Sequence, residues 1–368
     1  MKPLQVACLT PYQPSVGAST RYRIGQYVPL LEQHGIQVRM VPFASPKLQR
    51  ILYQPGRRLA KLAALVGSAL RWLPQALQDT DVVFIQREAA LLGPPLVERW
   101  LSHRYPVIYD FDDAIFLRQE VGVNGPLARK LRPLTKTSTL IGLSTMVFAG
   151  NEYLAEYARQ YNSHVHVVPT TLDHVMIQPK DQQAHSKLLT LGWIGTNATT
   201  RYLELALPAL EALAQVRPFR LLIVGADQPI EIAGVECINR RWNLEQETAD
   251  LQEMDIGLYP LPESTWSLGK CALKAIQYGA IGIPTVCTPI GMNLEVIHDE
   301  VTGFYASTSA EWVRRLTQLI DDAALRTRLG ATARQRIVQH YSLFKYDEII
   351  AHYIRQAADG PQPQMSNI

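Results

Sequence analysis

The sequence predicts an α/β protein of two doubly wound, Rossmann-like domains that face a cleft. Short apolar runs alternate with helical patterns from the first residues onward, which is typical of parallel sheets covered by helices. The alternation comes in two series, separated by a polar, proline-bracketed and aperiodic segment at 169–187 that we interpret as an interdomain linker. The 368 residues, 47% of them hydrophobic, can bury two cores of ordinary domain size.

The first series supplies the strands and helices of one domain. Apolar runs predict strands at 4–9, 36–41, 81–85, 106–109, 146–149 and 165–168. Helical spacing of apolar residues predicts helices at 21–34, 91–102 and 151–161.

The second series supplies the other domain. Strands are expected from 188 and at 219–225, 255–260 and 284–288. Helices are expected at 200–215, near 244–252, from about 269, and as a pair over 309–340.

These elements define the expected domain boundaries. The first domain spans 1–175 and the second 176–340, followed by a helix at 341–358 that returns to the first domain and a frayed tail at 359–368. Open parallel sheets bind ligands beyond the carboxyl ends of their strands. Two such domains therefore place their functional loops at the cleft.

Composition excludes several classes of protein. The formal net charge of +3 is too small for wholesale nucleic-acid binding, and no apolar run approaches the ~20 residues of a membrane span. The cysteines have neither pairs nor histidine partners at zinc-ligand spacing, so a reducing cytoplasm is the simplest compartment. They are Cys8, Cys237, Cys271 and Cys287.

Lysines in the stretch 260–293 indicate an anion site. Ser267 as an N-cap and Gly269 as a close-approach residue would place Lys270 in the first turn of a helix, with Lys274 one turn later. Both cations are unfavourable there unless an anion such as a phosphate arrives. The alternative is that the two lysines extend to solvent or pair with Glu263.

Two further glycine turns follow predicted strands of the second domain. One comprises Pro289, Ile290, Gly291, Met292 and Asn293, and the other Gly195, Thr196 and Asn197. A single turn of this kind is mostly structural, but three at the carboxyl ends of strands favour a nucleotide diphosphate ligand.

Three acids end a strand of the first domain. Asp110, Asp112 and Asp113 repel one another unless a cation or proton is near. They are compatible with a DxD-type metal site, an acylphosphate nucleophile, or a carboxylate aimed into the cleft; a helix cap for the segment from 114 would occupy only one of them. The nucleophile reading is disfavoured, because the acids fall midway along the series of strands.

Other polar residues of the first domain lie at comparable positions. They are Ser19, Arg21, Arg23, Gln86 and Arg87. Arginines at such positions bind an anionic acceptor or are ordinary surface charges.

Long stretches of the chain resemble the group 1 glycosyltransferases of the family 4 type, which have the GT-B fold. The second half is similar from GWIGTNATT through LLIVGAD and DIGLYPLPESTWSLGKCALKAIQYGAIGIPTVCTPIGMN to VTGF. The first half is similar in GASTRYRIGQ, QRE, YDFDDAIF and VPTTLD. The resemblance implies transfer of a sugar from a nucleotide-sugar donor on the second domain to an acceptor on the first, with no obligatory metal and no cofactor beyond that co-substrate.

Within this resemblance, the residues singled out above are expected to take specific roles. Lys270, Asp112 and Asp113 would be catalytic, and the acceptor residues would be Ser19, Arg21, Arg23, Gln86, Arg87 and Asp110. The donor residues would be Gly195, Thr196, Asn197, Ser267, Gly269, Lys270, Lys274, Gln277, Gly291, Met292 and Asn293.

Two departures from the family pattern matter. Two glutamates that the family places eight residues apart fall on Gly269 and Gln277, and a histidine of many relatives falls on Asp112. A carboxylate there would accept the acceptor's proton or stabilise an oxocarbenium ion, so retention or inversion stays open. A nucleotide-sugar epimerase and a non-catalytic nucleotide-sugar-binding protein remain alternatives.

The segment 46–78 carries six basic residues and no acid. Its helical apolar row, Leu59, Leu62, Ala63, Val66, Leu70 and Leu73, lies beside Arg57, Arg58, Lys61 and Arg71. This pattern suits contact with an anionic membrane surface, or packing of the apolar face on the domain's own sheet. The protein is expected in the cytoplasm, alone or at the inner face of the membrane, with a glycan or lipid-linked acceptor.

Overall fold

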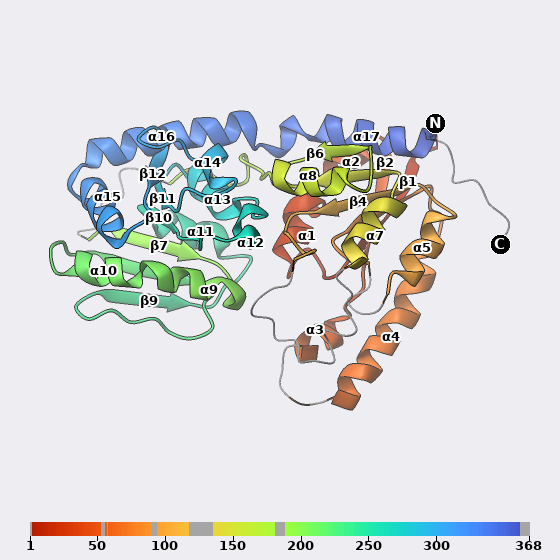
Figure 1. Cartoon of the computed structure of the whole chain (residues 1–368), viewed down its shortest axis with the longest axis horizontal. Coiled ribbons are helices and arrows are strands. Elements are labelled where there is room, and N and C mark those ends of the chain that lie inside the picture. The colour runs from red at the N-terminus through yellow and green to blue at the C-terminus, as the bar shows by residue number, and fades with distance from the viewer. Residues whose placement is uncertain are drawn as a thin grey trace. The chain divides into compact units, whose positions relative to one another are not determined.

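The computed structural model of the chain describes residues 2–52, 56, 58–89, 94–117, 135–180 and 188–360. The chain forms two compact units, each a sheet flanked by helices (Figure 1). Unit 1 comprises Met1–Thr170 and Leu343–Ile368, and unit 2 comprises Thr171–Ser342. The expected first boundary at 175 thus falls at 170, and the expected tail lies outside the described residues from 361 onward.

Unit 1 is built on a six-stranded parallel sheet in the order β2-β1-β3-β4-β5-β6. The strands are β1 (Leu4–Thr10), β2 (Ile36–Pro42), β3 (Val82–Gln86), β4 (Val107–Phe111), β5 (Met146–Ala149) and β6 (Val165–Val167). The inner strands β3, β4 and β5 are buried along their whole length, which explains their mostly apolar sequences.

The helices of unit 1 include the predicted ones, one of them in pieces, together with a helix at 135–143 that was not predicted. They are α1 (Ala18–Arg23), η1 (Gly25–Tyr27), α2 (Val28–Gln33), α3 (Pro46–Leu52), α4 (Arg58–Leu77), α5 (Leu96–Ser102), α7 (Thr135–Leu143), α8 (Glu152–Arg159), η3 (Leu343–Lys345) and α17 (Asp347–Asp359). The helix expected at 21–34 is therefore three short pieces. From the end of the chain, α17 places Ile350 and Ile354 in the same core as Val6 and Phe84.

Unit 2 repeats the architecture with the sheet order β12-β11-β10-β7-β8-β9. Its strands are β7 (Thr190–Ile194), β8 (Arg220–Val224), β9 (Glu236–Arg240), β10 (Ile256–Tyr259), β11 (Thr285–Cys287) and β12 (Gly303–Tyr305). The edge strands β9 and β12 were not predicted. β9 is half exposed and polar and β12 has three residues, so neither carries a clear apolar signal.

The helices of unit 2 are α9 (Asn197–Leu203), η2 (Glu204–Ala206), α10 (Leu207–Ala214), α11 (Glu247–Glu253), α12 (Thr265–Leu268), α13 (Leu273–Ala280), α14 (Asn293–Val296), α15 (Ser309–Asp321) and α16 (Ala323–His340). Local sequence fixes some of their starts. Thr308, for example, begins α15 with a capping box to Glu311. The predicted α/β fold with two doubly wound parallel sheets is confirmed. Within the described residues, no helix has the length and apolar character needed to cross a bilayer.

The orientation of α4 differs from one sequence expectation. The helix packs on unit 1 through Ser68, Trp72 and Ala76, and the Trp72 Nε1 donates a hydrogen bond to the Val41 carbonyl at 3.2 Å. Leu59 and Leu70, expected to pack on the sheet in one of the two interpretations, are instead exposed. Arg57 and the side chains of Arg58 and Leu62 lie outside the described residues.

Candidate active site

In unit 2, Lys274 lies over the aromatic residues that end two central strands. Its Nζ is 5.5 Å from the centre of the Trp193 ring on β7 and 5.2 Å from that of Tyr259 on β10. The Trp193 ring also underlies the glycine turn after β7, where a Cβ on Gly195 would lie 2.3 Å from it. The lysine and the glycine turn therefore share one aromatic support at the carboxyl edge of the sheet.

Tyr278 on α13 fixes the helix that carries Lys274. Its hydroxyl accepts a hydrogen bond from the Ile194 N–H at 3.2 Å and donates one to the Leu258 carbonyl at 3.3 Å. The ring lies against Gly257, where a Cβ would approach within 2.3 Å. Burial raises the pKa of Tyr278, so the hydroxyl stays neutral and holds both strands.

The predicted helix start at Ser267 is wrong. Ser264 caps α12, its hydroxyl accepting from the Ser267 N–H at 3.3 Å, and Ser267 lies inside that four-residue helix. The next helix, α13, begins only at Leu273, after Ala272 in the left-handed conformation with φ of 50°. Two serines three residues apart both fit a cap, and only packing selects Ser264.

The two lysines consequently do not share one helix. Lys270 lies in the connection between α12 and α13, with its Nζ 5.3 Å from the centre of the Trp266 ring. Lys274, not Lys270, is in the first turn of α13. The unfavourable first-turn position predicted from the sequence therefore belongs to Lys274.

The turn at 289–293 packs against this connection. Gly291 has a φ of +52°, and a Cβ there would lie 3.1 Å from Leu268 Cα and 3.2 Å from the Ser267 carbonyl oxygen. Met292 and Asn293 are buried, and the Asn293 side chain donates to the Thr288 carbonyl at 2.9 Å. The structure thus brings the 267–270 and 291–293 segments together, although the helix that follows, α14, has only four residues.

The remaining predicted donor residues are already engaged within unit 2. The Thr196 N–H donates to Thr199 Oγ1 at 3.0 Å, and Asn197 donates to Asp227 at 3.2 Å. Gly269 ends α12, and Gln277 is buried on α13. Sequence reasoning missed the aromatic residues Trp193, Tyr259 and Trp266, whose signal is their position directly beside the glycine and lysine positions.

In unit 1, Arg23 and Asp110 form a buried pair. Arg23 Nε lies 3.1 Å and 3.2 Å from the two Asp110 carboxylate oxygens, its Nη2 also contacts the carboxylate, and its Nη1 donates to the Val168 carbonyl. Burial raises the pKa of Asp110, and the Arg23 guanidinium opposes that rise. Neither side chain is more than 1% exposed, so the pair holds α1 and β4 together from within the core.

Arg87 joins the other two acids. Its Nη2 donates to Asp113 at 2.6 Å, and its Nε is 3.5 Å from Asp112. Burial alone would lower the pKa of Arg87, but the carboxylates of Asp112 and Asp113 raise it overall. The cation that the three acids require is therefore supplied twice by the fold, at Arg23 and at Arg87.

Three other predicted residues of unit 1 lie around this cluster. Ser19 accepts a hydrogen bond from Arg87 at 3.4 Å, and Gln86 accepts one from the Thr20 hydroxyl at 3.2 Å. Gln86 is fully buried, and among the described residues its Nε2 has no hydrogen-bond partner. Arg21 instead lies over Tyr22 and donates to the Pro14 carbonyl at 3.4 Å.

The structure narrows the possible roles of Asp110, Asp112 and Asp113. In the described part of the chain, no group of three or more acidic, histidine or cysteine side chains is placed to hold a metal ion. Asp110 points to Arg23, so a shared DxD site does not fit. Residues 114–117 form no helix, which removes the cap interpretation within that stretch.

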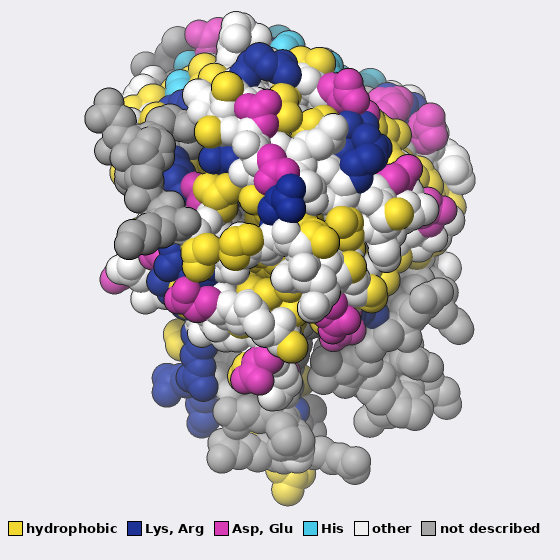
Figure 2. Space-filling model, turned by 90° about the vertical axis from the view of Figure 1, so that its left-hand side faces the viewer, with side chains coloured by type: hydrophobic (Ala, Val, Ile, Leu, Met, Phe, Trp, Pro, Cys, Tyr) yellow, Lys and Arg dark blue, Asp and Glu magenta, His cyan; other side chains and the backbone are white. Residues whose placement is uncertain are grey.

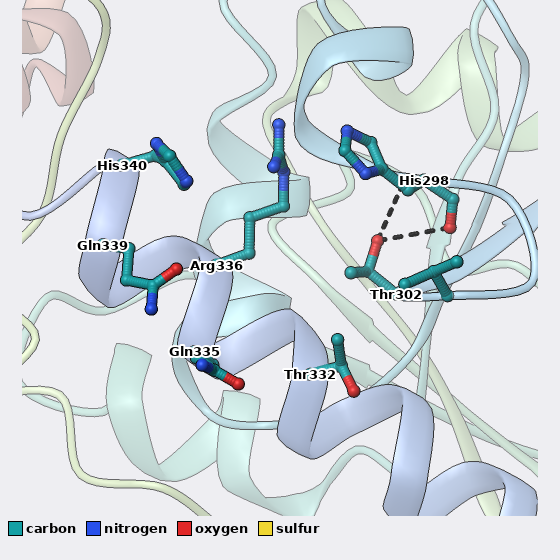
Figure 3. A pocket seen from close by; sticks show the side chains of 8 residues that line it. His298, Thr302, Thr332, Gln335, Arg336, Gln339 and His340 are labelled. Atoms are coloured by element: carbon teal, nitrogen blue, oxygen red, sulfur yellow. Dashed lines mark hydrogen bonds between the residues drawn. The ribbon is translucent and has the colours of Figure 1, made fainter.

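A pocket of about 240 Å³ lies elsewhere on unit 2, between α16 and the loop before β12 (Figure 3). His298, Arg336 and His340 line it, together with Thr302 and side chains of α16. Arg336 donates to the carbonyls of Val296 and Glu295, so it stabilises the C-terminal end of α14. None of the predicted site residues lines this pocket.

Comparison with known structures identifies the fold. Sucrose-phosphate synthase from Thermosynechococcus elongatus has a TM-score of 0.70 at 14% identity, covering 96% of this chain and 98% of that one. Anabaena HepE in complex with UDP and glucose has a TM-score of 0.65 at 16% identity, covering 96% and 99%. The lipopolysaccharide outer core galactosyltransferase WaaB has a TM-score of 0.58 at 11% identity, covering 96% and 100%. These likenesses show the GT-B fold.

Part of the sequence of unit 2 matches a family model. Residues 187–322 match the family model described as "Glycosyl transferases group 1". The predicted resemblance to the group 1 glycosyltransferases is thereby confirmed. No curated protein matches the chain in sequence.

Proposed function

We propose that the protein is a glycosyltransferase that moves a sugar from a nucleotide-diphosphate sugar to a hydroxyl of a glycan or lipid-linked acceptor, in the synthesis of cell-surface polysaccharide or glycoconjugate. The observation that carries the proposal is the arrangement in unit 2. Lys274, the Gly195 turn, Lys270 and the Gly291 turn gather at the carboxyl ends of β7, β10 and β11. The family match covers this same region.

The donor is a uridine-diphosphate sugar in this proposal. The solved structures of HepE hold UDP or UDP-glucose, and one of TarM holds UDP. The lysines supply the charge that such a diphosphate requires. Negative charge on the departing phosphate grows in the transition state, so fixed cations there accelerate the reaction as well as bind the donor.

Unit 1 binds the acceptor in this proposal. Arg87 holds Asp112 and Asp113 in place, and Asp112 accepts the proton of the acceptor hydroxyl or stabilises the oxocarbenium ion. Gln86 is fully buried and accepts a hydrogen bond from Thr20, so it supports this cluster from within unit 1 and does not contact the acceptor. No step uses a metal, so activity is expected to persist in EDTA.

Calorimetry with UDP tests the donor site. Lys270→Ala and Lys274→Ala should each weaken UDP binding by about tenfold or more, because each removes a cation from the diphosphate. Comparable losses are expected, since the structure places Lys274 rather than Lys270 at the start of α13. Lys345→Ala is the matched control: its Nζ also lies over an aromatic ring, Tyr346 at 5.9 Å, but in unit 1.

The outcomes separate the alternatives. Unchanged UDP affinity in both lysine variants would overturn the anion site. Turnover of UDP-sugar without any acceptor would identify an epimerase. Binding of the donor with neither hydrolysis nor transfer across a panel of acceptors would identify a non-catalytic binding protein.

A further inference from the structure

We propose that Tyr278 is a positioning residue for the nucleotide donor: its hydroxyl spreads the carboxyl ends of β7 and β10 and thereby sets where Lys274 meets the diphosphate. The inference rests on the proposed function, because it concerns how the donor site of unit 2 is held. Tyr278 is fully buried, so it acts through the residues around it and not by contact with the donor.

The hydrogen-bond ladder between β7 and β10 stops before either strand ends. Its last paired residues are Gly192 and Gly257, although each strand continues for two more residues. In a parallel pair of this register, the next bond would join the Ile194 N–H to the Leu258 carbonyl. Both groups instead bond to the Tyr278 hydroxyl, at 3.2 Å and 3.3 Å. A side-chain oxygen therefore takes the place of a main-chain hydrogen bond.

The inserted hydroxyl both joins the two strands and keeps them apart. One hydroxyl can accept a hydrogen bond from an N–H and donate its own proton to a carbonyl. With that oxygen between them, the N–H and the carbonyl are farther apart than in a direct bond of about 2.9 Å. The glycine at the end of the ladder makes room for the ring, since a Cβ on Gly257 would lie 2.3 Å from it.

The spreading occurs where the strand order of the sheet reverses. The order β12-β11-β10-β7-β8-β9 places β8 and β9 on one side of β7, and β10, β11 and β12 on the other. Open α/β sheets bind their ligands in the crevice outside such a switch point. The Tyr278 hydroxyl therefore separates the two strands at the place where the donor is expected.

The two strands that Tyr278 spreads carry the two rings beside Lys274. Trp193 lies on β7 and Tyr259 on β10, each next to a residue that bonds to the hydroxyl. The centres of these rings are 5.5 Å and 5.2 Å from the Lys274 Nζ. Lys274 precedes Tyr278 by four residues on α13, so both side chains lie on the same face of the helix. The spacing of the strands therefore fixes the rings and the ammonium group together.

The proposal is tested by calorimetry with UDP in three protein backgrounds. Tyr278→Phe keeps the ring but removes the hydroxyl, so the affinity for UDP should fall by about fivefold. The same change in a Lys270→Ala protein should lower the affinity by the same factor, because Lys270 lies over Trp266 on α12. In a Lys274→Ala protein it should have no further effect, because the residue through which Tyr278 acts is already gone.

Leu319→Val is the matched control for lost stability. Leu319 is fully buried in α15, and two residues later Asp321 pairs with Arg217, shortly before β8 begins. This end of α15 therefore lies at the amino ends of the strands, opposite the donor edge. Thermal unfolding should show that Tyr278→Phe and Leu319→Val both fold, with somewhat lower midpoints. Leu319→Val should leave the affinity for UDP unchanged.

The surface around α10 and α15 does not compete for UDP in this measurement. Figure 2 shows this side of unit 2, where acidic and basic side chains are interspersed over most of the face. Arg217, for example, is compensated by Asp321 at 2.7 Å. The described residues of that face thus offer a diphosphate no concentration of positive charge, and calorimetry reports on the lysines.

Three results would overturn the proposal. One is an affinity for UDP in Tyr278→Phe equal to that of the unmodified protein. Another is an equal loss in all three backgrounds, which would show that Tyr278 has no specific link to Lys274. The third is a matching loss in Leu319→Val, which would assign the effect to stability alone. Each of these leaves the proposed function standing, whereas an unmodified protein that does not bind UDP overturns the donor site and this inference with it.

Discussion

The carboxyl edges of the two sheets present their charges differently. In unit 1, Arg23 contacts Asp110, and Arg87 contacts Asp112 and Asp113, so cations and carboxylates compensate one another within the fold. In unit 2, Lys270 and Lys274 lie over the rings of Trp266, Trp193 and Tyr259. The first arrangement stabilises the protein without a ligand, whereas the second, in the proposed donor site, would bring its cations to an arriving anion.

Backbone strain accompanies both edges. Arg87 and Ala272 have φ of 60° and 50°, in the left-handed region that residues with a Cβ rarely adopt. Each directly adjoins a predicted site segment, the acid cluster in unit 1 and Lys270 and Lys274 in unit 2. Such strain persists only where surrounding contacts enforce it. At Arg87 the backbone N–H donates to the Asp110 carbonyl at 2.7 Å and the side chain pairs with Asp113.

The largest expected effect comes from removing the cation of the buried Arg23–Asp110 pair in unit 1. Arg23→Ala leaves the Asp110 carboxylate buried without its cation, so the free energy of unfolding should fall by about 3–5 kcal/mol. Urea denaturation measures this loss. Arg21→Ala, two residues away and half-exposed, should cost less than about 1 kcal/mol. Equal losses in the two variants would contradict the distinction between a buried pair and a surface charge.

Asp112→Asn should reduce kcat by about a hundredfold or more, because an amide keeps the shape of the carboxylate but neither accepts a proton nor carries charge. UDP affinity should stay near that of the unmodified protein, since the proposed donor residues lie in unit 2. Asp113→Asn, which loses the 2.6 Å contact with Arg87, should have the smaller effect on kcat. Full kcat in the Asp112→Asn variant would show that Asp112 has only a structural role. The cluster of Arg87, Asp112 and Asp113 would then serve only to stabilise unit 1.

The smallest expected effect is a loss of stability in mild acid. Burial, and then His164, lower the pKa of His166, which stacks on Tyr353 in unit 1; burial, and then Arg336, lower that of His298 in unit 2. The unfolded chain therefore binds protons near the ordinary value of 6.5, where the folded chain does not.

The free energy of unfolding should consequently fall as the pH drops below about 6.5. His166→Gln and His298→Gln should each flatten this dependence, measured by urea denaturation from about pH 7 to about pH 5. A profile that is unchanged in both variants would show that other groups cause the acid sensitivity.

Much of the fold could be predicted from the sequence. The buried strands β1, β3, β4, β7 and β8 are short apolar runs, and parallel pairing follows because a helix separates each from the next. Caps such as Asn151, which accepts from the Leu154 N–H at 2.9 Å, are equally local. The edge strands β9 and β12 were not predicted, because an exposed or very short strand has no continuous apolar pattern.

Only part of the candidate site could be predicted from the sequence. Its segments were found from glycines, lysines and acids that follow strands, since the ends of parallel strands meet at one edge of a sheet. The contacts between these segments could not be predicted. The partner of Asp110 lies 87 residues away at Arg23, and Trp193 contacts Lys274 on a helix about 80 residues later. Local patterns carry no information about such pairs.

The sequence by itself determined most of the order of elements, the presence of two parallel sheets and the resemblance to the group 1 glycosyltransferases, because apolar periodicity and short motifs depend on near neighbours. Tertiary structure decided where α12 ends and α13 begins, because either Ser264 or Ser267 suits a cap and only the packing of Gly291 on Ser267 and Leu268 distinguishes them. It also decided which face of α4 is buried. Two faces of that helix are apolar enough to pack, and the sheet accommodates the one with Trp72, whose indole reaches the Val41 carbonyl.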